Sequence, residues 1–212
     1  MLFRKSPEKF WNLIAKRYAA SPIADRQAYE TKIAKIKSYL SPEQVVLDIG
    51  CGTGTQCADL AGYVKQMTGI DIASKLLAIA QQRMAERKLA NVDFLQTSLF
   101  DERLQPGSFD VVLAFFVLHL VDDLGAVLQR IHALLKPGGL FISETACLGE
   151  KNKIAGRLIR LGGHLGLIPK INLLTTDNII HTLKQTGLSV VDKEKFSQRI
   201  DAEYTLFARK PG

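Results

Sequence analysis

The stretch "VVLDIGCGTG" at residues 45–54 is the most informative part of this 212-residue chain. An apolar run ends on Asp48, and the glycines Gly50, Gly52 and Gly54 then alternate with small residues. A buried strand followed by a glycine loop is typical of the first turn of an open α/β sheet, where such folds bind ligands. Because glycine lets the backbone approach a ligand closely, this loop is the first candidate site.

Composition describes one ordinary globular domain, with 47% hydrophobic residues and a formal net charge of +7. The charge favours anionic partners, but the basic residues form no dense block, so nucleic acid is an unfavoured partner. The three cysteines lack the spacing of a zinc site or a disulfide framework, and we expect no metal. We expect a cytoplasmic protein, because the start lacks an apolar signal segment and the apolar run 111–121 is too short to span a bilayer.

Apolar runs of strand length alternate with helical patterns, which predicts a mostly parallel sheet flanked by helices. The expected strands are residues 44–49, 66–72, 92–96, 109–115, 140–145, 188–196 and 203–209. The expected helices are Pro7–Ala20, Asp25–Leu40, 74–88 (capped by Ser74), 122–136 and 175–187. We divide the single domain 1–212 into an N-terminal helical cover (1–40), a core (41–145), an insertion (146–174) and a C-terminal helix with strands (175–212).

Spacing and charge in the loop indicate which ligand it binds. A dinucleotide fingerprint GxGxxG that starts at Gly50 would need a glycine at position 55, which is Thr55. Asp48 would repel a pyrophosphate but attract an ammonium group. Asp71, at the end of the second expected strand, is placed to accept hydrogen bonds from two ribose hydroxyls. Together these residues favour S-adenosylmethionine over a dinucleotide.

With these residues the chain resembles the class I S-adenosylmethionine-dependent methyltransferases that act on small molecules. The resemblance extends to "GIDIAS" (69–74), "FDVVLAFFVLHLVDD" (109–123) and "LLKPGGLFI" (134–142), in the order and spacing of that family. It implies a Rossmann-like, doubly wound sheet of seven strands. The last two strands are expected to form an antiparallel hairpin, with the final strand inserted between its neighbours.

The resemblance also implies a set of residues that bind the cofactor. They are Tyr18, Asp48, Gly50, Cys51, Gly52, Gly54, Asp71, Ile72, Ser98, Leu99 and Phe115. The three glycines would surround the methionine part, and Asp48 would serve its amino group directly or through water. Asp71 would hold the ribose hydroxyls, and Ile72 would pack on the adenine.

Other contacts implied by the resemblance are less regular in this chain. The family usually has an acid near position 98 that receives the adenine amino group, whereas this chain has Ser98 followed by Leu99. Either the Ser98 hydroxyl or a backbone carbonyl could accept that hydrogen bond. Phe115 would line the face of methyl transfer, and Tyr18 and Ile23 resemble residues that cover the methionine end.

Methyl transfer from a sulfonium depends chiefly on proximity and alignment, and a base is needed only when the acceptor carries a proton. His119, which follows the fourth expected strand, is a candidate base, and its alternative is a packed, hydrogen-bonded histidine. Glu144, at the end of the fifth expected strand, could bind or deprotonate the acceptor, and its alternative is a structural hydrogen bond.

Residues 150–174 are the most individual segment of the sequence. One helical stripe there is apolar and the adjoining face is basic: Ile154, Leu158, Leu161 and Leu165 against Lys153, Arg157, Arg160 and His164. We interpret the segment as a substrate lid for a lipophilic or anionic acceptor, with peripheral membrane contact. The alternative is a helix on the sheet edge with solvated charges.

The sequence therefore predicts a methyltransferase that uses S-adenosylmethionine, forms S-adenosylhomocysteine and methylates a small organic acceptor, as a monomer or homodimer. Methylation of RNA or another macromolecule is one alternative, although no RNA-binding pattern stands beside the basic charge. A regulator that binds the cofactor without turnover is a second alternative. A nicotinamide-dependent oxidoreductase is the third.

Overall fold

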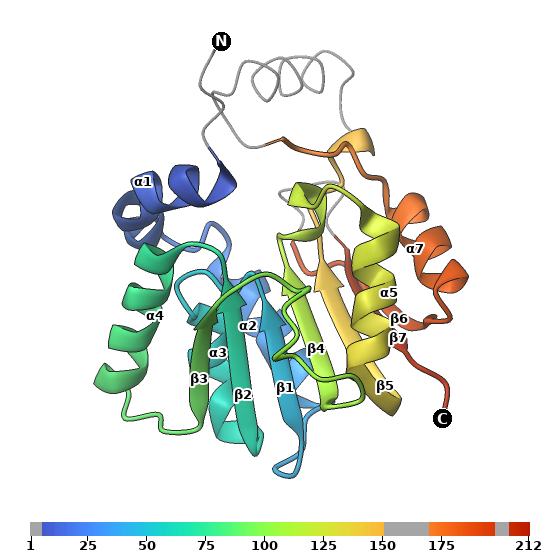
Figure 1. Cartoon of the computed structure of the whole chain (residues 1–212), viewed down its shortest axis with the longest axis horizontal. Helices are drawn as coiled ribbons and strands as arrows, with labels where there is room; N and C mark the ends of the chain where they lie inside the picture. Colours follow the sequence, from blue (N-terminus) through green and yellow to red (C-terminus); the bar gives the residue numbers. More distant parts are fainter. Residues whose placement is uncertain (1–5, 151–169, 198–203) are drawn as a thin grey trace.

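The computed structural model describes residues 6–150, 170–197 and 204–212 (Figure 1). Seven strands form one sheet in the order β3-β2-β1-β4-β5-β7-β6. Their bounds are β1 Val45–Ile49, β2 Gln66–Asp71, β3 Val92–Gln96, β4 Phe109–Phe115, β5 Leu135–Glu144, β6 Ser189–Glu194 and β7 Thr205–Arg209. Strands β1 to β5 pair in parallel, and β7 lies antiparallel between β5 and β6. The predicted seven-stranded fold and its inserted last strand are confirmed.

Helices cover both faces of the sheet (Figure 1). Their bounds are α1 Pro7–Ala20, α2 Arg26–Lys37, α3 Thr55–Leu60, α4 Ser74–Glu86, α5 Leu124–Leu134 and α7 Thr176–Gln185. Apolar residues of α2, α3 and α4 share one core cluster with the sheet, and those of α5 and α7 share the other. The central strands β1 and β4 supply residues to both clusters, which explains why they are apolar without alternation.

Two predicted boundaries are wrong in instructive ways. Ser74 is not the cap of α4: the cap position is Ala73, which has no side-chain cap bond. Instead, the Lys75 amide donates to the side-chain oxygen of Asn12 at 2.9 Å, so α1 satisfies the start of α4 from outside. Strand β5 begins at Leu135, before "KPGG", and not at residue 140 as predicted, because Leu135 pairs with Phe109 of β4. The register between the two strands then shifts, and pairing resumes at Val111 and Leu140.

The docking of α1 onto α4 brings the N-terminal segment to the carboxyl end of β2. Ala15 packs with Leu76 of α4 and with Ala73, the cap position of that helix, in a small separate cluster. The ring of Tyr18 then lies 3.9 Å from the position that a Cβ on Gly52 would take. This helix therefore reaches the glycine loop, as the predicted role of an N-terminal cover requires.

The insertion predicted to be a lid falls largely outside the described residues, since 151–169 are not among them. Its proposed apolar stripe and basic face therefore stay predictions, and so does membrane contact. Within the described ranges, no helix has the length and apolarity needed to cross a membrane. The same ranges contain no cluster of three or more His, Cys, Asp or Glu side chains arranged to hold a metal ion.

Candidate functional site

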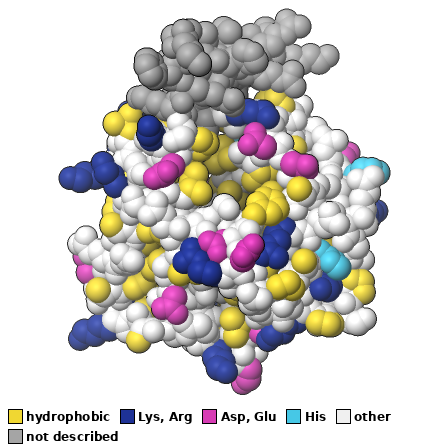
Figure 2. Space-filling view, viewed as in Figure 1, with side chains coloured by type: hydrophobic (Ala, Val, Ile, Leu, Met, Phe, Trp, Pro, Cys, Tyr) yellow, Lys and Arg dark blue, Asp and Glu magenta, His cyan; other side chains and the backbone are white. Residues whose placement is uncertain are grey.

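The candidate site lies at the carboxyl edge of the parallel strands, beneath α1 and beside α2. Hydrophobic side chains surround a hollow there, with charged side chains near its rim (Figure 2). We divide this edge into a cofactor half, at the ends of β1, β2 and β3, and an acceptor half, at the ends of β4 and β5 and the start of the antiparallel β7. The two halves meet where β1 pairs with β4.

The glycine loop after β1 has a backbone that only glycine adopts without strain. Gly50 and Gly54 both have a φ of +66°, and Gly54 occupies the cap position of α3. A Cβ on Gly50 would lie 2.9 Å from Val117 Cγ2, and one on Gly54 would lie 2.9 Å from Ala80 Cβ. Any larger residue would therefore deform the loop against its neighbours as well as strain its backbone.

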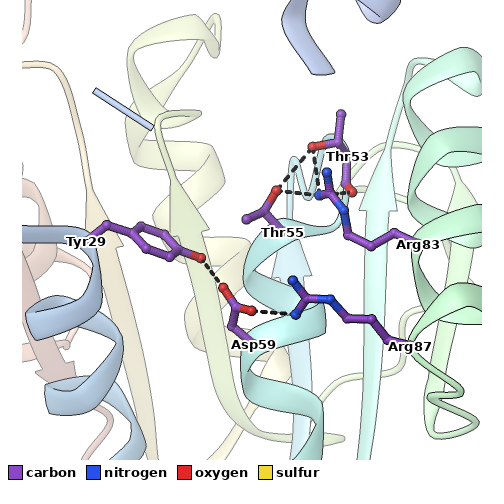
Figure 3. A network of polar contacts seen from close by, with 6 residues as sticks. All are labelled: Tyr29, Thr53, Thr55, Asp59, Arg83 and Arg87. Atoms are coloured by element: carbon purple, nitrogen blue, oxygen red, sulfur yellow. Dashed lines mark hydrogen bonds and ion pairs between the residues drawn. The ribbon is translucent and has the colours of Figure 1, made fainter. Parts of the chain in front are cut away.

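Arg83 of α4 holds this loop from the side (Figure 3). Its guanidinium donates to the Thr53 carbonyl at 2.6 Å, to Thr53 Oγ1 at 3.2 Å and to Thr55 Oγ1. One turn further along, at the C-cap of α4, Arg87 donates to Asp59 at 2.6 Å, and Asp59 also accepts from the Tyr29 hydroxyl at 2.7 Å. The first arginine thus fixes the loop, whereas the second joins α4 to α3 and α2.

Asp71, at the end of β2, is oriented by two backbone amides. Gly52 N–H donates to Oδ2 at 3.0 Å and Ala73 N–H donates to Oδ1 at 2.8 Å. Partial burial raises the pKa of Asp71, and the amides of Ala73 and Gly52 oppose that rise. Each carboxylate oxygen keeps a second lone pair, so the group can still accept two hydroxyl hydrogen bonds. Burial and the Asp71 charge together raise the pKa of Tyr18.

Asp48 lies under the glycine loop with only 2% of its surface exposed. The Cys57 thiol donates to its Oδ2 at 3.2 Å. Burial raises the pKa of Asp48 to about 7, a rise that the Cys57 hydrogen bond only partly opposes. A cationic group bound nearby would favour the ionised carboxylate, so this acid suits a ligand with an ammonium group.

The other residues predicted for the cofactor face different ways. Ile72 and Ser98 are exposed at the ends of β2 and β3, as a surface for adenine requires. The side chain of Cys51 packs in one core cluster and that of Leu99 in the other. Because the Leu99 carbonyl accepts from Arg130 Nε at 3.3 Å, this residue is tied into the fold as well. The side chains of Cys51 and Leu99 are therefore part of the core.

At the end of β4 the structure exposes a residue that the sequence interpretation passed over. Phe115 is buried in the core cluster with α2, α3 and α4, whereas Phe116 is 39% exposed. Phe116 has a φ of +55°, and its amide donates to the Glu144 carbonyl at 2.7 Å. A bulky residue in this conformation stores strain, which is typical of functional sites. No sequence pattern marks a positive φ at phenylalanine.

Glu144, at the end of β5, forms a buried ion pair with Lys32 of α2. The sequence interpretation missed Lys32, because a lysine on an amphipathic helix normally points to solvent. The spacing in α2 did indicate an inward position for Lys32, because it lies beside Tyr29, Ile33 and Ile36, which form the stripe of α2 that faces the sheet. Glu144 thus forms the structural contact that was the alternative to a role in catalysis. It also lies at the edge where the methyl acceptor is expected.

His119 and two threonines carry buried polar atoms that have no hydrogen-bond partner among the described residues. These atoms are His119 Nδ1, Thr145 Oγ1 and Thr205 Oγ1. The His119 carbonyl accepts from the Asn172 amide at 2.8 Å, and burial lowers the pKa of its imidazole. A neutral imidazole with an unpartnered nitrogen could accept a proton or a hydrogen bond. All three residues belong to the acceptor half.

Comparison with known proteins assigns the chain to a family. A methyltransferase domain model matches residues 40–197, and the chain belongs to this family of S-adenosylmethionine-dependent methyltransferases. A ubiquinone biosynthesis O-methyltransferase of Bradyrhizobium diazoefficiens is 39% identical over 179 residues, which cover 77% of this chain and 70% of that protein. One from Albidiferax ferrireducens is 42% identical over 105 residues, covering 48% of this chain and only 41% of that relative.

Solved structures share the fold at low sequence identity. The [4+2]-cyclase SpnF superimposes with a TM-score of 0.78 at 19% identity, covering 96% of this chain and 94% of that one. A phosphoethanolamine N-methyltransferase of Haemonchus contortus, in complex with S-adenosylhomocysteine, has a TM-score of 0.74 at 20% identity, covering 98% and 61%. The glycine loop and Asp71 suit S-adenosylmethionine, the cofactor of this family. The named reactions of these structures differ, so the fold alone does not determine the methyl acceptor.

Proposed function

We propose that this chain transfers the methyl group of S-adenosylmethionine to a hydroxyl oxygen of a small, largely apolar acceptor. The observation that carries the proposal is the Asp71 carboxylate, held by the amides of Gly52 and Ala73 beside the glycine loop. The hollow with hydrophobic side chains around it (Figure 2) and the exposed ring of Phe116 support an apolar acceptor. The relatives named O-methyltransferases support oxygen as the methylated atom.

Different residues of the cofactor half bind different parts of the cofactor. In this proposal the loop of Gly50, Gly52 and Gly54 receives the methionine part, and Asp48 pairs with its amino group. Asp71 accepts from the ribose hydroxyls. The exposed side chains of Ile72 and Ser98 then face the adenine, and Tyr18 of α1 covers the methionine end.

When bound, the cofactor supplies a methyl group on a positively charged sulfur, already activated for displacement. The protein has to align the acceptor oxygen with that methyl and remove the oxygen's proton. Two groups of the acceptor half could take the proton: the Glu144 carboxylate and the neutral imidazole of His119. Phe116 and Phe115 supply the apolar surroundings that exclude water.

Replacing Asp71 by alanine tests the cofactor site. We expect the dissociation constant of S-adenosylmethionine, measured by calorimetry, to rise about 100-fold, because two hydrogen bonds to a charged acceptor are lost. The matched control is Asp93→Ala, which removes an exposed carboxylate on the neighbouring strand β3 that accepts from Gln66. Unchanged binding in the Asp71 variant would contradict the proposed site.

The acceptor class is tested on the wild-type protein. Incubation with S-adenosylmethionine and catechol, 4-nitrocatechol or 3,4-dihydroxybenzoate should form S-adenosylhomocysteine together with an O-methylated product, identified by mass spectrometry. Amines of similar size serve as the comparison. If only the amines are methylated, oxygen is the wrong acceptor atom although the cofactor assignment stands.

A further inference from the structure

The ion pair between Lys32 and Glu144 is buried at the acceptor half of the site. Only 5% of the surface of Lys32 and 8% of that of Glu144 are exposed. Removing two charges from water costs so much that a buried pair of this kind is weak evidence for stability, and apolar residues of similar size often serve as well. A pair held at the carboxyl edge, where this fold binds its ligands, therefore calls for a chemical role.

Aromatic rings connect the buried ammonium group to the surface. Lys32 Nζ lies 5.1 Å from the ring centre of Phe115, 5.4 Å from that of Tyr29 and 5.6 Å from that of Phe116. Of these rings, Phe116 is 39% exposed, so it borders both solvent and the ammonium group. A flat, ring-bearing acceptor that packs on Phe116 would bring a ring substituent toward Lys32.

Thr205 supplies a second, independent sign of a polar ligand. It lies directly opposite Glu144 in the antiparallel register of β5 and β7, so both side chains point to the same face of the sheet. Its surface is 1% exposed, and its hydroxyl has no hydrogen-bond partner within the described part of the chain. Leaving such a group unpaired is costly, and a polar atom of a bound ligand would satisfy it.

We propose that Lys32 is a catalytic residue: its ammonium group binds the acceptor hydroxyl oxygen and stabilises the negative charge that develops there. This inference rests on the proposed O-methylation. Lys32 occupies Glu144 Oε2, so the second carboxylate oxygen takes the proton as the acceptor O–H bond breaks. The oxygen forms a bond to the methyl carbon, and the methyl–sulfur bond breaks with its electron pair left on sulfur. Thr205 donates to a neighbouring polar atom of the acceptor.

The first test follows the ionisation of a bound acceptor and requires no turnover. The phenol 4-nitrocatechol absorbs visible light when ionised, so its pKa on the protein can be read from absorbance against pH in the presence of S-adenosylhomocysteine. We expect the wild-type protein to lower that pKa by about one to two units, because a cation contacts the oxygen. Lys32→Met should abolish the shift, and Lys32→Arg should retain part of it.

Two further variants separate this role from a structural one. The double change Lys32→Met with Glu144→Gln removes both charges together, which leaves no unpaired charge in the core if the single variant folds poorly. Lys35→Met removes a lysine one turn along the same helix whose ion pairs go to Asp192 and Glu194 of β6. The control should keep the full shift in nitrocatechol pKa, and the folded double variant should show none.

The second test compares acceptors of different acidity. In Lys32→Met, kcat/KM for catechol should fall about 100-fold, the usual effect of removing one stabilising donor, and that for the more acidic 4-nitrocatechol about 10-fold. An equal loss for both acceptors, or an unshifted nitrocatechol pKa on the wild-type protein, overturns the role of Lys32. If the wild-type protein methylates no hydroxyl at all, the proposed function fails instead.

Discussion

The cofactor half and the acceptor half of the sheet edge differ in how their buried polar atoms are partnered. In the cofactor half, the Asp71 oxygens accept from backbone amides and Asp48 accepts from Cys57. The glycine loop is likewise held by Arg83. In the acceptor half, His119, Thr145 and Thr205 each carry a buried polar atom without a partner among the described residues.

This difference indicates what each half needs from its ligand. The cofactor half is formed by hydrogen bonds within the protein, so it is ready for a ligand that is the same in every turnover. The acceptor half keeps a strained Phe116 and unpaired polar groups, whose cost a bound acceptor would relieve. Cofactor binding should therefore respond to changes in the first half, and acceptor binding to changes in the second.

Asp48→Asn should act on the cofactor half alone, with an effect smaller than that of Asp71→Ala but larger than those of the variants that follow. Because the pKa of Asp48 is about 7, wild-type affinity for S-adenosylmethionine should increase as pH rises from about 5.5 to about 7.5 and the carboxyl ionises. The asparagine variant should bind about 30-fold more weakly at pH 7.5, having lost a charge-assisted contact, and without that pH dependence. Calorimetry at several pH values measures both effects. A change in acceptor KM of similar size would break the division into halves.

The same substitution should stabilise the ligand-free protein at high pH. A carboxyl whose pKa is raised on folding holds its proton more tightly in the folded state, so stability falls as pH rises from about 4 to about 7. At about 1.4 kcal/mol per pKa unit, the loss approaches about 4 kcal/mol above pH 7. The asparagine variant lacks this loss. Urea unfolding at pH 5 and pH 8 gives the change in the free energy of unfolding with pH for the wild-type protein and the variant.

Arg83→Met sharpens the comparison through a matched pair of arginines. The variant loses the contacts to Thr53 and Thr55, so we expect S-adenosylmethionine to bind about 10-fold more weakly. Arg87→Met removes a neighbouring arginine on the same helix that contacts Asp59 and not the loop (Figure 3). This control should change cofactor affinity less than about twofold. Equal losses in the two variants would mean that the loop does not depend on Arg83.

Phe116→Gly should have the smallest effect and acts on the acceptor half. Glycine adopts a φ of +55° without strain, which offsets the loss of a ring that is already partly exposed. Thermal stability should therefore change by less than about 1 kcal/mol. We expect acceptor KM to rise about fivefold with cofactor affinity unchanged, as steady-state kinetics and calorimetry can show. Weaker cofactor binding would show that the halves are coupled.

Much of the fold could be predicted because its signals are local. Strands β3 and β4 and helix α1 have the bounds that their apolar patterns predicted, since each pattern spans one whole element. The inserted position of β7 followed from family resemblance alone, because pairing between distant strands leaves no local pattern. Ser74 failed as a cap because Asn12, far away in the sequence, satisfies that helix end.

The sequence offered candidate residues in both halves, and the residues that it missed all lie in or beside the acceptor half. Asp48 and the glycines belong to one recognisable motif and Asp71 to a second, at residues 69–74, whereas Lys32, Phe116 and Thr205 come from segments without a motif. Their proximity depends on the packing of α2 and the pairing of β5 with β7. A lysine that turns inward and a phenylalanine with positive φ are exceptions to residue preferences, and such exceptions appear only in the folded chain.

The place of β7 between β5 and β6 has a consequence for synthesis of the protein. Until residues 205–209 have been made, β5 and β6 both present unpaired edges that could join other chains. Strands β1 to β5 and their helices come earlier and can assemble without them. Nascent chains halted before β7 should therefore be the species most prone to aggregate, and a chaperone that covers strand edges would protect them.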